Sequence, residues 1–102
     1  MTRNSKPRPG HVYVIANTAW PGWYKVGRAS RLHQRLESYQ TGSPHRDYFL
    51  VQSFKVRDAV FAEAAAHQLL ASRHERQHEW FRIKELPSAL DALSELVEKS
   101  NA

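Results

Sequence analysis

Cysteine is absent from the 102-residue sequence, which excludes disulfide bonds and zinc sites built on thiolates. The sequence also has no apolar run of about eighteen residues, so no membrane-spanning helix is expected. Its first segment, MTRNSKPRPG, lacks the apolar stretch of a secretory signal. These absences predict a cytoplasmic protein with no membrane association, and a chain of this length is expected to form one domain with a single modest core.

Acidic residues are scarce in the first half of the chain. Glu37 is the only one in residues 1–46, and the whole chain carries 15 Lys and Arg against 10 Asp and Glu, a net charge of +5. A basic excess concentrated in one part of a chain favours a polyanionic partner. We expect that partner to be DNA, with RNA as an open alternative. The other interpretation is a basic surface that only keeps the protein in solution.

Three segments have the composition of β-strands. HVYVIA (11–16) and WYKVG (23–27) are rich in β-branched and aromatic residues, and the turn-forming NTAWPG between them predicts a hairpin. YFLVQSFKV (48–56) alternates and predicts a third strand. Four of its apolar side chains are expected on one side: Tyr48, Leu50, Phe54 and Val56.

Three other segments have the apolar spacing of helices. In the first, Ser30 is the expected N-cap, ahead of an apolar row formed by Leu32, Leu36 and Tyr39. The second, at 59–73, begins after Asp58, and its buried row is expected to be Phe61, Ala65 and Leu69. The third, at 86–99, carries Pro87 in its first turn and is expected to be an amphipathic closing helix.

The order β-β-α-β-α-(β)-α predicts an α+β fold, sandwich-like, in which a small three-stranded, mainly antiparallel sheet is flanked by helices. The bracketed element is a short extended piece at 79–83. Residues 1–9 are expected to be a flexible basic arm, and residues 10–102 a single domain.

One motif suggests a zinc peptidase. His74-Glu75-Arg76-Gln77-His78 spells H-E-x-x-H, which on a helix places two His one turn apart to bind zinc, with the Glu as general base. The segment is polar on all sides, however, and a chain of this size leaves little room for a peptide groove. We therefore interpret it as a polar helix end, with Trp80 and Phe81 of the following EWF completing the core.

The two hairpin strands carry a pair of short motifs. GHVYV (10–14) contains Tyr13, and YKVG (24–27) contains Lys25. Arg35 follows eight residues after the second motif, in the first predicted helix. These are residue types that occur around reacting phosphates.

The second predicted helix continues the pattern with Glu63 and His67, an E-x-x-x-H pair, and EWF follows at 79–81. In this order the five elements resemble the GIY-YIG nuclease superfamily. The K-V-G in place of Y-I-G resembles a small phage and bacterial branch of it, the phage T5-type open-reading-frame domain. The resemblance covers about three quarters of the chain, residues 10–83.

The resemblance implies an endonuclease that hydrolyses DNA phosphodiester bonds with one divalent metal ion, Mg²⁺ or Mn²⁺. Glu63 would bind the metal, Arg35 would stabilise charge on the phosphate, and His67 would donate a proton or support the metal shell. Tyr13 or Lys25 would activate the water. Since a phenol has a pKa of about 10, Tyr13 needs a neighbouring cation for this role, whereas Lys25 needs a pKa depressed by burial.

Contacts to nucleic acid are expected from five further residues: Trp20, Arg28, Arg31, His33 and Arg46. The alternative function is a non-catalytic nucleic-acid-binding module on the same scaffold. The sequence leaves open whether the protein is a monomer or a homodimer.

Overall fold

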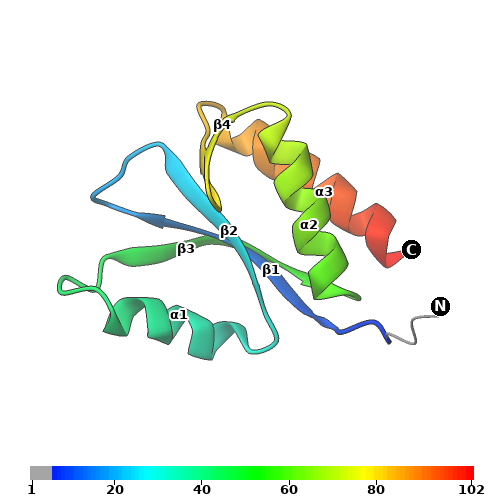
Figure 1. Cartoon of the computed structure of the whole chain (residues 1–102), viewed down its shortest axis with the longest axis horizontal. Coiled ribbons are helices and arrows are strands. Elements are labelled where there is room, and N and C mark those ends of the chain that lie inside the picture. The colour runs from blue at the N-terminus through cyan, green and yellow to red at the C-terminus, as the bar shows by residue number, and fades with distance from the viewer. Residues whose placement is uncertain (1–5) are drawn as a thin grey trace.

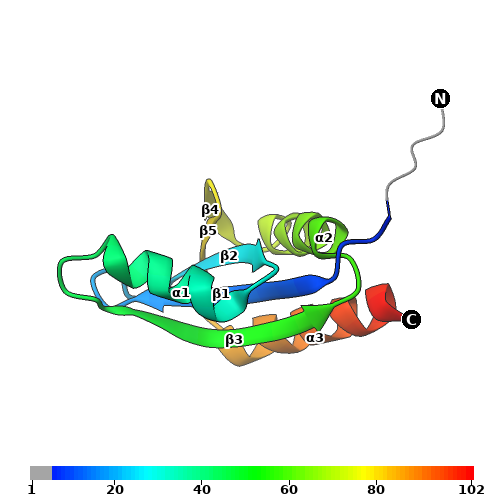
Figure 2. The same ribbon diagram turned by 90° about the horizontal axis from the view of Figure 1, so that it is seen from below.

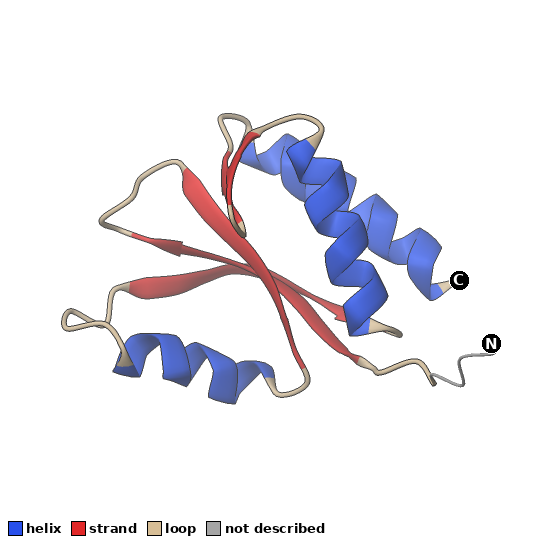
Figure 3. Ribbon diagram, viewed as in Figure 1, coloured by secondary structure: helices blue, strands red, loops and turns tan. Residues whose placement is uncertain are grey.

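The computed structural model describes residues 6–102, which form a five-stranded sheet with helices on both faces (Figures 1 and 3). The elements are β1 (Gly10–Asn17), β2 (Trp23–Ala29), α1 (Leu32–Thr41), β3 (Tyr48–Val56), α2 (Ala59–Ala71), β4 (Glu75–Gln77), β5 (Trp80–Arg82) and α3 (Leu86–Asn101). The fold class is α+β, as predicted. Of the arm predicted at 1–9, residues 1–5 lie outside the described part, and residues 6–9 form no helix or strand.

The sheet has two more strands than the sequence predicted. Its order is β3-β1-β2-β5-β4, and all neighbouring strands are antiparallel. The additional pair is the short hairpin β4–β5, in which β5 lies within the extended piece predicted at 79–83 and β4 was not predicted. Every residue of its outer strand is exposed, so no alternation of apolar and polar side chains marks it in the sequence.

The hairpin contains most of the H-E-x-x-H motif, so the interpretation of that segment as a helix end is wrong. Helix α2 stops at Ala71, and the chain then turns back through β4. His78 lies at the hairpin turn with a φ of 56°, in the left-handed region. His74 and His78 are therefore not one helical turn apart, and the geometry of a helical zinc peptidase motif is absent.

Alternation along β1 sends successive side chains to opposite faces of the sheet. Val12 and Val14 join Val26 in the core beneath α2 and α3, whereas Tyr13 and Ile15 face α1. Figure 1 shows α1 on one side of the sheet and the α2–α3 pair on the other. In the second view α2 lies against β2 and α3 against β3 (Figure 2).

The third strand does not present its apolar side chains to one side. The pairing of β1 with β3 shifts by one residue at Val51, which is a β-bulge. Before the bulge Tyr48 packs on the α1 side, and after it Phe54 and Val56 lie in the core beneath α2 and α3. A single extra residue reverses the alternation, so the predicted one-sided pattern is wrong.

Helix α2 begins at its predicted cap but buries a different face. Asp58 accepts a hydrogen bond from the backbone N–H of Phe61 at 3.3 Å. Phe61 itself is 61 % exposed, and the buried residues of the helix are Ala59, Ala62, Glu63, Ala66 and Leu70. Because nearly every residue of this helix is apolar, spacing alone did not select the face. The observed orientation turns Glu63 inward.

The first helix begins one residue later than predicted. Arg31 takes the N-cap position and makes no side-chain cap hydrogen bond, so the assignment of Ser30 as the cap is wrong. The apolar row of α1, formed by Leu32, Leu36 and Tyr39, does pack on the sheet as expected.

The closing helix α3 has Pro87 in its first turn and buries Leu93 and Val97, as predicted. Near its end the Asn101 side chain donates to the carbonyl of Lys55 and accepts from the backbone N–H of Arg57. These two bonds attach the helix to the end of β3. Within residues 6–102, no helix combines the length and the apolar character needed to cross a membrane.

Candidate functional site

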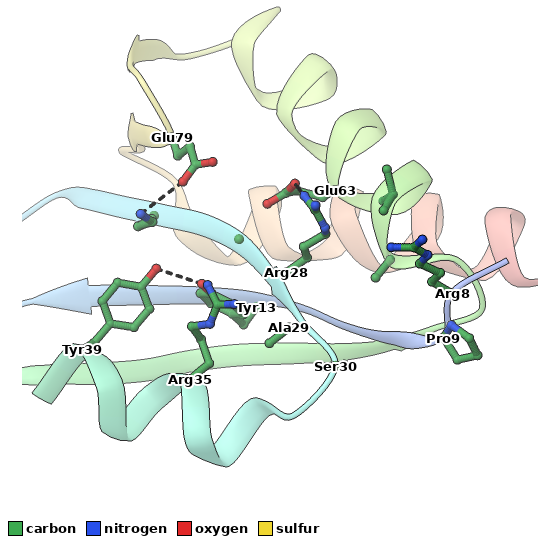
Figure 4. Close-up of a pocket in the computed structure, with 14 residues that line it drawn as sticks. Arg8, Pro9, Tyr13, Arg28, Ala29, Ser30, Arg35, Tyr39, Glu63 and Glu79 are labelled. Carbon is green, nitrogen blue, oxygen red and sulfur yellow. Dashed lines mark hydrogen bonds and ion pairs between the residues drawn. The ribbon is translucent and has the colours of Figure 1, made fainter. Parts of the chain in front are cut away.

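The main pocket lies along an open stretch of the β2 edge. In the described part of the chain, β5 pairs with only Trp23–Lys25 of β2, so the following residues of that strand have no neighbouring strand there. Helices α1 and α2 flank this stretch from opposite faces of the sheet, and a pocket of about 440 Å³ lies between them (Figure 4). Its chemically active lining consists of Arg8, Tyr13, Lys25, Arg28, Arg35, Tyr39, Glu63 and Glu79.

Gly27, the last residue of the K-V-G motif, leaves room for Tyr13. The two residues are cross-strand partners, and a Cβ at Gly27 would collide with the hydroxyl and ring of Tyr13. The phenol therefore crosses β2 and reaches the pocket. There its hydroxyl lies 2.8 Å from the hydroxyl of Tyr39, with the two rings edge to face.

The surroundings of Tyr13 favour the neutral phenol. Burial raises its pKa well above the usual range, and the hydrogen bond with Tyr39 raises it further. The charge of Arg35 lowers the pKa of Tyr13, but the pKa stays raised overall. The free protein therefore does not hold Tyr13 as a phenolate near neutral pH.

Lys25 lies beside both Tyr39 and Glu79. Its Nζ is 3.1 Å from Oε1 of Glu79 and 5.4 Å from the centre of the Tyr39 ring. Burial lowers the pKa of Lys25, but the hydrogen bond to Glu79 and the proximity of Tyr39 outweigh burial, so the pKa is raised overall. The depressed pKa that a general base at this position requires is not found.

Glu63 is the buried carboxylate of the pocket. It projects from α2 and is 9 % exposed, although an isolated charge at such a position is costly. Arg28 on β2 compensates by donating a 2.7 Å hydrogen bond from Nη1 to Oε1 of Glu63 (Figure 4). The expected contact of Arg28 with nucleic acid stays a prediction, and in this structure Arg28 forms an ion pair with Glu63.

His67 lies one turn after Glu63 and is fixed by the backbone of β2. Its Nε2 is 2.7 Å from the carbonyl oxygen of Val26, and its ring packs against Phe81 at 5.8 Å. A carbonyl only accepts hydrogen bonds, so Nε2 carries the proton and Nδ1 of the neutral ring keeps its lone pair. This arrangement resembles the backbone support that orients metal-binding His residues.

Three side chains form a candidate metal site. Ligand atoms of Glu63, His67 and Glu79 all lie within 4.8 Å of one another. Two carboxylates and one imidazole suit Mn²⁺ well, and the carboxylates alone suit Mg²⁺. Both carboxylates contact cations, Arg28 and Lys25, so a metal ion would compete with existing ion pairs.

Arg35 projects from the first turn of α1 into the pocket, beside Tyr13 (Figure 4). Two acids close to it in sequence have other partners. Glu37 contacts His33 at 2.7 Å, and Asp47 accepts from Ser43 at 2.7 Å. Within residues 6–102 Arg35 forms no ion pair, which leaves its guanidinium available to an anion.

Four of the residues expected to contact nucleic acid lie outside this pocket. Arg31 is the N-cap of α1, His33 is exposed and contacts Glu37, and Arg46 follows α1 at a φ of 50°. Trp20 lies in the β1–β2 loop and is 49 % exposed. Their contacts with nucleic acid stay predictions.

Tyr39 and Glu79 are pocket residues whose roles the sequence did not predict. Tyr39 was assigned to the apolar row of α1, which correctly places its ring but overlooks its hydroxyl. Glu79 was treated as part of the core-closing EWF segment, although its side chain belongs to the pocket rather than to the core. The presence of a charged residue directly before two aromatic residues was the available signal.

The fold and the pocket define a small α+β domain with carboxylates and cations gathered on one open sheet edge. The family model described as the T5orf172 domain matches residues 10–100, and the chain belongs to this family. The match confirms the resemblance to the phage T5-type domain. No curated protein and no solved structure matches the chain.

Proposed function

We propose that the protein is a metal-dependent endonuclease of the GIY-YIG type that hydrolyses DNA phosphodiester bonds. The observation that carries this proposal is the convergence of Glu63, His67 and Glu79 with a pocket that also holds Tyr13 and Arg35. A carboxylate-rich site beside the Arg35 guanidinium, which forms no ion pair within residues 6–102, suits a cation and a phosphate together. Membership of the T5orf172 family is consistent with a nuclease-like or DNA-binding domain.

A bound Mg²⁺ or Mn²⁺ would neutralise charge on the scissile phosphate and stabilise the departing oxygen. Glu63 would hold the ion, with Glu79 and His67 as additional ligands. Arg35 would bind the phosphate oxygens from the opposite wall of the pocket, where charge accumulates in the transition state. Release of Arg28 from Glu63 would add a second cation for the phosphate.

Tyr13 is the better placed of the two candidates for positioning the water, because its hydroxyl reaches the pocket. Its raised pKa disfavours it as a base in the free protein, and Arg35 offsets only part of the effect of burial. Lys25 is disfavoured as the base because its pKa is raised and its ammonium is paired with Glu79. Tyr39 would hold the Tyr13 hydroxyl in position through their 2.8 Å hydrogen bond.

The test incubates supercoiled plasmid and single-stranded DNA with Mg²⁺, Mn²⁺ or chelator. Wild type is expected to cleave only with metal, and Glu63→Ala is expected to lose at least about 100-fold in rate, as for loss of a group that stabilises the transition state. Glu37→Ala is the matched control, because it removes an exposed carboxylate on α1. Cleavage that persists in Glu63→Ala, or no metal-dependent cleavage at all, would overturn the proposal.

A second candidate function is a non-catalytic nucleic-acid-binding module. The observation favouring it is that both pocket carboxylates already pair with cations, Glu63 with Arg28 and Glu79 with Lys25. Such a module would bind DNA with a steep salt dependence and without a metal requirement. DNA rather than RNA, a cytoplasmic location, and a monomer or homodimer stay predictions under either function.

A further inference from the structure

A second, aromatic pocket lies beside the one already described. Trp20 and Trp23 from the β1–β2 loop and strand, with Gln77, His78 and Trp80 from the β4–β5 hairpin, enclose about 270 Å³. We call this the tryptophan pocket. All three tryptophans of the chain line it, although Trp80 was expected to belong to the core.

The tryptophan pocket opens on the same face of the sheet as Lys25. Trp23 and Lys25 are two residues apart on β2, so their side chains point to the same face. Trp80 is the cross-strand partner of Lys25, which places it on that face as well. At about 3.3 Å of strand rise per residue, Trp23 lies about 7 Å from Lys25 along β2, a distance that one nucleotide spans.

A row of aromatic rings connects the two pockets. The ring centroids of Tyr13 and Tyr39 are 6.1 Å apart, and those of Tyr39 and Tyr48 are 5.3 Å apart. The row continues from Tyr48 to Trp20 at 6.5 Å and from Trp20 to Trp80 at 5.5 Å. Tyr13 and Tyr39 belong to the main pocket, and Trp20 and Trp80 to the tryptophan pocket. The row of rings therefore runs from one pocket to the other.

The geometry of the indoles suits a flat ligand. Trp20 and Trp80 stand at 78° to each other, which makes a corner of two ring planes. Trp20 is 49 % exposed, so burial in the core does not account for its ring. A base inserted into the corner would stack on one indole and meet the edge of the other.

The loop that carries Trp20 is braced internally. The backbone N–H of Trp20 donates to the carbonyl of Asn17 at 3.0 Å, and that of Trp23 donates to the carbonyl of Trp20 at 3.2 Å. The buried Asn17 side chain accepts from the backbone N–H of Ala19 at 2.8 Å and donates to Asp47 at 3.0 Å. The backbone that carries the exposed indole is thus held in place before any ligand arrives, which lowers the entropic cost of binding.

We infer that the tryptophan pocket binds an unstacked nucleobase of the nucleotide next to the phosphate held by the main pocket. This inference rests on the proposed function and specifies its substrate class: nucleic acid with a single-stranded or extrahelical nucleotide at the point of cleavage. Bases inside an intact duplex are stacked on their neighbours and do not reach the corner without flipping. Gln77 and His78 line the rim of the pocket with polar groups for the edge of the base.

The test measures binding in chelator, so that no cleavage occurs. Three fluorescein-labelled probes of about 12 nucleotides are compared: an oligothymidine strand, the same strand with abasic residues throughout, and a fully paired duplex. The variants are Trp20→Ala and Trp20→Phe. Phe49→Ala is the matched control, because Phe49 is also exposed, by 48 %, and lies outside the tryptophan pocket.

Trp20→Ala is expected to weaken binding of the oligothymidine strand about 10-fold or more, and to change binding of the abasic strand and the duplex less than about 2-fold. Trp20→Phe keeps an aromatic face and is expected to recover most of the affinity. Phe49→Ala is expected to match wild type on all three probes. Thermal unfolding checks that each variant is folded under the conditions of the assay.

An equal loss on all three probes, or no loss on the oligothymidine strand, would overturn the inference. The two proposals fail separately. If wild type cleaves no DNA but the base-dependent loss in Trp20→Ala is observed, the nuclease is rejected and the tryptophan pocket stands. If wild type cleaves and Trp20→Ala binds every probe like wild type, the tryptophan pocket is rejected and the nuclease stands.

Discussion

Arg28 and Glu63 form a 2.7 Å ion pair that joins the open edge of β2 to the buried face of α2. The side chain of Glu63 is 12 % exposed and that of Arg28 is 47 % exposed, so the carboxylate depends on the guanidinium more than the reverse. A carboxylate oxygen engaged with Arg28 is less available to a divalent cation. Binding of a metal ion at Glu63 is therefore expected to release Arg28 toward the substrate.

The first prediction concerns metal-dependent stability. Arg28→Ala leaves Glu63 largely buried without its partner, so the free energy of unfolding in chelator is expected to fall by about 1–3 kcal/mol. Mn²⁺ is expected to restore much of this loss, because it replaces the missing positive charge. Urea unfolding with and without Mn²⁺ measures both effects. Arg31→Ala, at the exposed N-cap of α1, is the control and is expected to change neither; equal behaviour of the two variants would contradict the prediction.

The second prediction concerns the K-V-G glycine. Gly27→Ala forces a Cβ against the Tyr13 ring, so a loss of about 1–3 kcal/mol in the free energy of unfolding is expected, together with reduced cleavage. Gly42→Ala is the matched control, because the nearest atom to its Cβ would lie at 3.7 Å and its φ is −80°. Denaturant unfolding and the plasmid assay test both variants. Similar unfolding midpoints for the two would show that Tyr13 moves aside freely.

The third prediction concerns alkaline pH. Because the folded-state pKa of Tyr13 is raised above the unfolded value of about 10, its contribution to stability is complete below that pH and is lost as pH rises through the folded pKa. Ultraviolet absorbance titration of wild type and Tyr13→Phe isolates this residue by difference. The absorbance change from ionisation of Tyr13 is expected only above about pH 10, together with unfolding of the protein. A difference signal centred below that pH would show a phenolate in the folded protein and would support Tyr13 as a ready base.

The fourth prediction concerns the orientation of α2. Leu70→Ala removes a fully buried side chain and is expected to cost about 2–5 kcal/mol in the free energy of unfolding. Phe61→Ala removes a larger but 61 % exposed side chain and is expected to cost less than about 1 kcal/mol. Urea unfolding of the two variants gives the comparison. A larger loss in Phe61→Ala would mean that the helix buries the face predicted from its spacing.

The parts of the fold predicted correctly are those in which one local pattern has one physical solution. The strands at 11–16 and 23–27, rich in β-branched and aromatic residues, and the Asp58 cap are of this kind. Helix α2 is apolar on most sides, so its spacing fitted more than one buried face. The outer strand β4 is exposed on every residue, so no apolar pattern marked it, whereas β5 lies within the predicted extended piece at 79–83. The bulge at Val51 depends on pairing with β1 and has no signal within its own strand.

In the pocket, too, residues with a local sequence signal were predicted, and those that depend on distant contacts were not. Tyr13, Lys25, Arg35 and Glu63 were identified from their type and order, and the structure brings all of them to one pocket. Glu79 was missed because its role depends on the hairpin, whose turn at His78 directs it toward Lys25. The ion pairs of Glu63 and Glu79 depend on contacts between residues far apart in sequence, which spacing does not encode.

The position of β5 beside β2 has a consequence for synthesis of the protein. Tyr13 and Lys25 are translated early, but Glu79 and the strand that supports it are translated only after α2. A nascent chain that has exposed the first two strands and the basic residues around them therefore still lacks one wall of the pocket. The order of translation postpones assembly of the complete pocket until most of the domain has left the ribosome.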